Sequence, residues 1–170
     1  MTLECVKVNS MNAEDKIPAE TWFQAITPLL HDGHQFRICP QGQSMVPFLR
    51  GGRDEAVLSA PDERYQFKKN DIVLFKTSNG LHKLHRICHI NKQGIYTLGD
   101  GNTLSEGPIQ RDDVLAVADY IIRKGRIINN DNRRYLFLIS IWRLIRPLRP
   151  FILRGYSTIK RLEYRLKRNN

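Results

Sequence analysis

The chain of 170 residues contains only three cysteines, Cys5, Cys39 and Cys88, at irregular spacing. An odd and irregular set does not form a disulfide framework, which favours a reducing compartment and a fold without disulfide staples. The first residues, 1–16, also lack the apolar core of a secretory signal, because charged side chains interrupt them. We therefore expect a cytoplasmic protein, long enough for one domain and an appendage.

No strongly apolar run is long enough to cross a bilayer as a helix. The stretch 135–142 is far shorter than the roughly 20 residues that a spanning helix needs. Acidic residues are scarce where basic ones gather, since the segment from Arg133 to Arg168 has eleven Lys or Arg residues against one acidic residue, Glu163. This segment accounts for the whole net charge of +10, and the rest of the chain is neutral.

The charge distribution separates a neutral body from a basic tail, and the helix and strand pattern divides the body further. Residues 1–34 form an N-terminal segment with a helix, residues 35–128 a β domain, and residues 129–170 a basic tail that begins with a polar, turn-prone run. Two prolines in the tail, Pro147 and Pro150, interrupt any continuous helix. Beyond them, two sets of residues at helical spacing predict a basic amphipathic helix. The apolar set is Tyr156, Ile159, Leu162 and Leu166, and the basic set is Arg161, Arg165 and Arg168.

Three partners fit such a tail. Its aromatic residues stand beside basic ones: Phe137, Trp142 and Phe151 beside Arg143, Arg146 and Arg149. This composition favours an anionic membrane surface, contacted by residues 133–170 from the inner face as a peripheral protein. Nucleic acid is an unlikely partner, because the tail is more apolar than a phosphate-binding arm needs and no recognition motif accompanies it. The remaining alternative is that the apolar stripe packs on the body of the protein or on another protein.

The body has the pattern of a mainly β protein. Apolar residues at three-and-four spacing predict one helix over residues 19–30, which ends before Asp32 and Gly33. Later apolar segments are short and separated by turn signals such as Ser78-Asn79-Gly80, which predicts strands. We expect strands near residues 36–38, 71–75, 81–90, 95–98 and 114–123. The alternating helices of a parallel α/β sheet are missing from this pattern.

Chemistry is best argued from Ser44, which lies in the run Gly42-Gln43-Ser44-Met45-Val46-Pro47. A serine hydroxyl is a nucleophile only when a base takes its proton. His85 is the candidate base, and Lys83, two residues away on the same face of a strand, is the alternative. Asp100 or Glu106 could hold the imidazole in the correct tautomer.

A metal site is the competing interpretation of the same region. His82, His85 and His89 occur with Cys88 within eight residues, and three of them would share one face of a helix. The flanking turns favour a strand, however, which separates these side chains. We therefore expect neither a metal nor any other cofactor.

Four short motifs occur in a characteristic order: Ser44-Met45-Val46-Pro47, Asn70-Asp71-Ile72-Val73-Leu74-Phe75, His85-Arg86-Ile87 and Gly99-Asp100-Gly101-Asn102. In this order they resemble the S24/S26 superfamily of serine peptidases, which includes signal peptidases and LexA-type repressors. The resemblance covers residues 36–125. With histidine at the base position, the chain is similar to the SipW-like and endoplasmic-reticulum signal peptidases. The resemblance implies the signal peptidase/LexA-like β core.

The resemblance also has departures. Signal peptidases often have a serine two residues before the nucleophile, where this chain has Gly42, so the backbone N–H of Ser44 is the expected oxyanion donor. A membrane anchor and a helix-turn-helix domain are not evident. We expect a serine-type endopeptidase that cleaves a peptide or precursor protein by a Ser-His mechanism. The alternative is a catalytically inactive binding or scaffold protein of the same fold at the membrane surface.

Overall fold

The structure is a computed structural model, and it describes residues 6–7, 25–30, 32–149, 151–152 and 155. Residues 25–30 are helical. The elements are β1 (Val6–Lys7), β2 (Phe36–Cys39), β3 (Glu55–Ser59), β4 (Ile72–Lys76), β5 (His82–Asn91), β6 (Gly94–Leu98), β7 (Glu106–Ile109), η1 (Arg111–Asp113), β8 (Val114–Arg123), β9 (Arg126–Asn129), α2 (Arg133–Leu144) and η2 (Arg146–Leu148).

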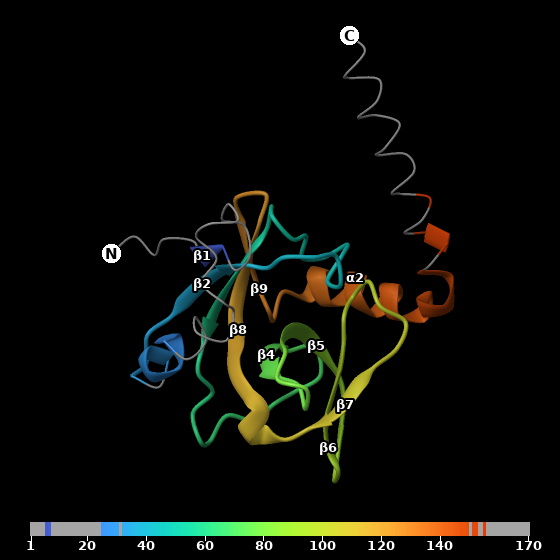
Figure 1. Cartoon of the computed structure of the whole chain (residues 1–170). Coiled ribbons are helices and arrows are strands. Elements are labelled where there is room, and N and C mark those ends of the chain that lie inside the picture. Colours follow the sequence, from blue (N-terminus) through green and yellow to red (C-terminus); the bar gives the residue numbers. More distant parts are fainter. Residues whose placement is uncertain (1–5, 8–24, 31, 150, 153–154, 156–170) are drawn as a thin grey trace.

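The prediction of a mainly β protein is confirmed. One sheet has the order β1-β2-β3-β8-β4-β5-β6-β7, and β9 pairs with β8 outside this path. All pairs are antiparallel except β1 with β2. Figure 1 shows that the sheet is strongly curved and that α2 lies beside it. Each of the five predicted strands corresponds to a strand of the sheet.

Strand β4 shows why its sequence is a continuous apolar run. Its side chains alternate between two cores, as the pleat of a strand requires. Ile72 and Leu74 belong to the larger core, whereas Val73 and Phe75 belong to the smaller one. Both faces of β4 are therefore buried, and the two cores together fix the strand next to β5.

The larger core also includes both helical segments. Ile26 and Leu30 of the N-terminal helical residues are buried in it, as are Tyr135 and Ile139 of α2. The side chain of Asn132 caps α2 by accepting a hydrogen bond from a backbone N–H in its first turn. The beginning of the basic tail is therefore part of the folded body. Residues 19–24 of the predicted N-terminal helix and the predicted helix over 156–168 lie outside the described residues.

The tail arginines differ from the arrangement that we expected at a membrane surface. Arg143, Arg146 and Arg149 donate hydrogen bonds to backbone carbonyls of the body or of α2 itself. Trp142 likewise donates its indole N–H to a carbonyl of the body. The three arginines and Trp142 satisfy carbonyl groups that the folded chain would otherwise leave unpaired. Contact of the tail with an anionic membrane surface stays a prediction.

The prediction of a fold without disulfide staples is also wrong at one position. Cys39 is disulfide-bonded, whereas Cys88 is a free thiol. Strand β1 runs beside β2 with Lys7 opposite Cys39. Strand pairing thus brings the start of the chain next to Cys39. The spacing of cysteines along the sequence does not show this. The cysteine content thus no longer favours a reducing compartment.

Within the part of the chain that the structure describes, no helix combines the length and the apolar character needed to cross a membrane.

Candidate active site

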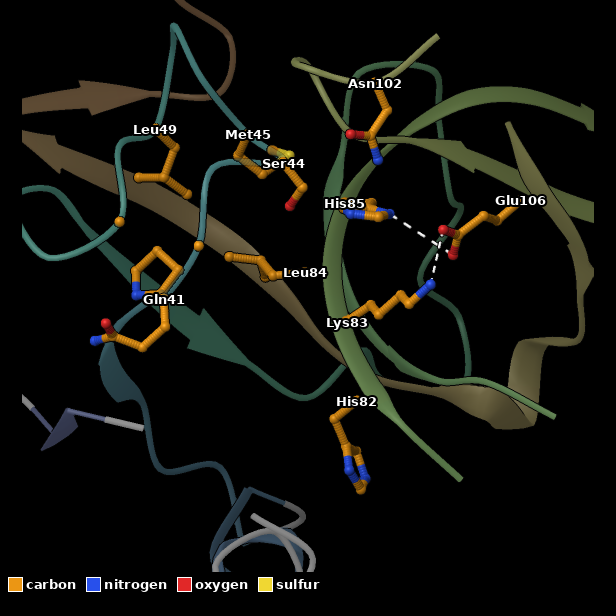
Figure 2. A pocket seen from close by; sticks show the side chains of 13 residues that line it. Gln41, Ser44, Met45, Leu49, His82, Lys83, Leu84, His85, Asn102 and Glu106 are labelled. Atoms are coloured by element: carbon orange, nitrogen blue, oxygen red, sulfur yellow. Dashed lines mark hydrogen bonds and ion pairs between the residues drawn. The ribbon is translucent and has the colours of Figure 1, made fainter. Parts of the chain in front are cut away.

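A cavity of about 290 Å³ brings together side chains from three distant parts of the sequence. Ser44 lines it from the loop between β2 and β3, Lys83 and His85 line it from β5, and Glu106 lines it from the start of β7. Figure 2 shows these four side chains around one space. Four of the residues predicted for the site therefore meet in one place, and Asp100 does not line the cavity.

Ser44 is the first residue of a series of turns, and the residue after it, Met45, is buried. Met45 is only 4% exposed and belongs to the larger core together with Phe48 and Leu49. The Met45 carbonyl accepts backbone hydrogen bonds from both Phe48 and Leu49, at 3.1 and 2.9 Å. The methionine thus fixes the loop on the core by its burial, while the preceding residue, Ser44, stays at the cavity.

Two glycines pack directly against the backbone of this loop. A Cβ atom on Gly99 would lie 2.6 Å from the Ser44 carbonyl oxygen, and one on Gly101 would lie 2.9 Å from the Gln43 carbonyl oxygen. The N–H of Gly101 also donates a 2.7 Å hydrogen bond to the Ser44 carbonyl. Both glycines are therefore required for close approach of the two loops.

Asp100, between these glycines, is buried and paired with Arg86. Two arginine nitrogens donate to its carboxylate, Nε to Oδ1 at 3.0 Å and Nη2 to Oδ2 at 2.9 Å. Burial lowers the pKa of Arg86, but the Asp100 carboxylate and the Tyr135 hydroxyl together raise this pKa above its ordinary value. Arg86 also donates to the Tyr135 hydroxyl at 3.0 Å and to the Asn70 carbonyl at 2.9 Å. Asp100 thus holds Arg86, and through it α2, rather than His85.

His85 faces Glu106. Its Nδ1 lies 3.9 Å from Glu106 Oε2, and both atoms are buried without a hydrogen-bond partner. In Figure 2 the Nδ1 side of the ring faces Glu106 and the other ring nitrogen is on the side of Ser44. A carboxylate at this position favours the tautomer with a proton on Nδ1, which leaves the nitrogen on the Ser44 side free to accept a proton.

The surroundings of His85 favour the neutral form of the ring. Burial is the largest influence and lowers the pKa of His85, and the Lys83 ammonium lowers it further. The Glu106 and Asp100 carboxylates act in the opposite direction without reversing the shift. A buried neutral imidazole is the form that a general base requires.

Lys83 forms an ion pair with Glu106. Its Nζ donates to Glu106 Oε1 at 2.8 Å. An ammonium group that donates in an ion pair has no lone pair with which to accept a proton. The arrangement therefore favours His85 over Lys83 as the base.

Ser44 and His85 are not hydrogen-bonded to each other. Within the described part of the chain, the Ser44 hydroxyl and the Ser44 N–H have no hydrogen-bond partner. An unpaired N–H beside the hydroxyl is available to an oxyanion. Long or missing contacts between nucleophile and base are common before a substrate binds.

The C-terminal segment supports this site in a way that the sequence did not reveal. Trp142 Nε1 donates to the Asp100 carbonyl at 2.5 Å, Arg146 Nε to the Thr103 carbonyl at 2.6 Å, and Arg149 Nη1 to the Asn102 carbonyl at 2.7 Å. These three donors hold the loop that contacts Ser44. Only the basic and aromatic composition of the tail could have indicated them.

The described residues contain no group of three or more His, Cys, Asp or Glu side chains that could hold a metal ion. No protein-family model, no curated protein and no solved structure matches the chain.

Proposed function

We propose that the protein is a serine-type endopeptidase, with Ser44 as nucleophile, His85 as general base and Glu106 as the carboxylate that orients the base. The observation that carries the proposal is the position of the His85 ring, between Ser44 and Glu106 in one cavity. The four ordered motifs of the sequence support it, since they resemble the S24/S26 peptidases and the signal peptidase/LexA-like fold.

The proposed reaction follows from these positions. The Ser44 hydroxyl oxygen attacks the carbonyl carbon of the scissile peptide, and His85 takes the hydroxyl proton. The tetrahedral oxyanion accepts a hydrogen bond from the Ser44 N–H. When the C–N bond breaks, the leaving amine takes the proton from His85. Water, deprotonated by the same imidazole, then hydrolyses the Ser44 ester and releases the new carboxylate.

One edge of β5 offers a place for the substrate backbone. Residues 82–86 pair with β4 on one side, whereas pairing with β6 begins only at Arg86 on the other. Among the described residues, no strand occupies the second edge at Lys83 to His85, and these residues line the cavity. An extended peptide could pair with this edge and present a carbonyl to Ser44.

A serine-reactive fluorophosphonate probe tests the proposal. Intact-mass analysis and peptide mapping should find one adduct, on Ser44, in the wild type and in the Ser78→Ala control, which alters an exposed turn serine. Ser44→Ala should abolish labelling and His85→Ala should reduce it roughly 100-fold or more. Labelling that His85→Ala leaves unchanged would exclude the proposed base.

A second candidate, a catalytically inactive binding protein, is favoured by one observation. In the part of the chain that the structure describes, Ser44 has no hydrogen bond to His85. A binding protein needs only the open β5 edge. In that case Ser44→Ala would leave the cellular phenotype intact, whereas a substitution that blocks the β5 edge would remove it.

A further inference from the structure

The outer face of α2 and η2 is apolar and exposed. Phe137, Ile141, Leu144 and Leu148 recur at helical spacing, and their exposed fractions are 65%, 43%, 81% and 53%. Phe151, three residues after Leu148, is 70% exposed. We call these five residues the outer stripe. Several exposed apolar side chains along one helical segment are a candidate interaction site in a folded protein.

The opposite side of the same helix is occupied by the body. Tyr135 and Ile139 lie in the larger core, and Trp142 and Arg149 hold the loop beside Ser44. The outer stripe therefore cannot be an inward face that has yet to pack, because the helix already packs through its other side. Among the described residues, nothing covers the stripe, so we look for its occupant outside this part of the chain.

Charge identifies the kind of occupant. Arg133 and Arg134 are exposed at the start of α2, and residues 150–170 add six Lys or Arg against Glu163. A second copy of the chain would bring two strongly basic segments together, which costs energy, whereas an anionic surface attracts them. An apolar stripe beside basic residues is the pattern of a helix that lies in the interface of an anionic bilayer.

We infer that the outer stripe of α2 and η2 inserts into the surface of an anionic lipid bilayer while the inner side of the same segment holds the active-site loop. The catalytic cavity would thus be fixed near the membrane by the element that supports it. Binding does not depend on Ser44, so this inference stands or falls independently of the proposed peptidase activity.

Vesicle cosedimentation with the full chain tests the inference by point substitutions. Deletion of residues 133–170 is unsuitable, because it also removes Tyr135 and Ile139 from the core. The double variant Phe137→Ser with Leu144→Ser alters only exposed side chains. The matched control is Leu81→Ser with Ile127→Ser, two side chains that are 57% and 65% exposed elsewhere. Unchanged thermal midpoints would verify that both variants fold.

Wild type and control should sediment with vesicles of phosphatidylglycerol and phosphatidylcholine. Binding should weaken with salt and on pure phosphatidylcholine. The stripe variant should bind roughly tenfold or more weakly. Equal binding by the stripe variant would overturn the inference. So would a wild-type dimer, seen by analytical ultracentrifugation without lipid, that the stripe substitutions dissociate, because the stripe would then bind a second copy.

Discussion

The backbone N–H of Gly101 donates a 2.7 Å hydrogen bond to the carbonyl of Ser44. The proposed nucleophile is thus positioned by a loop that follows it by more than fifty residues. Gly99 packs against the same carbonyl so closely that no side chain larger than a hydrogen atom fits there. The first and fourth sequence motifs are therefore two sides of one contact.

Substitution Gly99→Ala should displace Ser44. The added methyl group would lie 2.6 Å from the Ser44 carbonyl oxygen, and overpacking of this kind costs about 1–3 kcal/mol. A shift of roughly 1 Å at a reacting group can lower a rate about 100-fold, so probe labelling of Ser44 should slow by this order. The control is Gly155→Ala, where no atom lies within 4 Å. Normal labelling of Gly99→Ala would show that this contact does not position Ser44.

Substitution Asp100→Asn should destabilise the fold. It leaves the Arg86 guanidinium, 1% exposed, without its charge partner, and breaking a buried pair in this way costs about 3–5 kcal/mol. Urea unfolding measures the loss. The control is Asp112→Asn, an acidic side chain that is exposed. A loss below about 1 kcal/mol for Asp100→Asn would contradict the assigned structural role.

The pH dependence of labelling should report His85 as the base. Since burial lowers the pKa of His85 below 6.5, the labelling rate should rise with pH through an apparent pKa below that value. The Lys83 ammonium lowers this pKa and the Glu106 carboxylate raises it. Lys83→Met should therefore move the rising limb to higher pH, and Glu106→Gln should move it to lower pH and slow labelling. Shifts in the same direction would contradict the arrangement.

Stability should depend on pH through the same group. The folded protein has the lower pKa at His85, so below the ordinary value of 6.5 the unfolded chain binds the proton more readily. Stability is then lost as pH falls from about 6.5 through the folded pKa. Urea unfolding at several pH values measures this slope, and His85→Gln should reduce it. An unchanged slope in His85→Gln would assign the dependence to other groups.

The sequence indicated the strands that carry long apolar runs, but not all the others. β3 has only three buried apolar residues, too short a run to predict a strand. β7 contains Gly107 and Pro108, which are typical of turns. The order of the motifs predicts Ser44 and His85, whereas Lys83 is predicted from its place two residues before His85 and Glu106 as a possible acidic partner of the base. The sequence does not decide whether Asp100 or Glu106 orients His85. The answer depends on which of the two carboxylates forms the ion pair with Arg86. That choice follows from tertiary packing, which local patterns do not contain.

The same limit applies to Arg149, for which the composition of the tail predicts contact with a membrane surface. This side chain is 1% exposed and donates to the carbonyls of Asn102 and Trp142. Arg149→Met should release the loop over residues 99–103, because two carbonyls lose their donor and a buried unpaired group costs about 1–3 kcal/mol. Hydrogen exchange measured by mass spectrometry should be faster in peptides that span this loop, and labelling of Ser44 should slow. Arg134→Met, which alters an exposed arginine at the start of α2, is the control. If exchange in the loop is the same in both variants, Arg149 does not hold it.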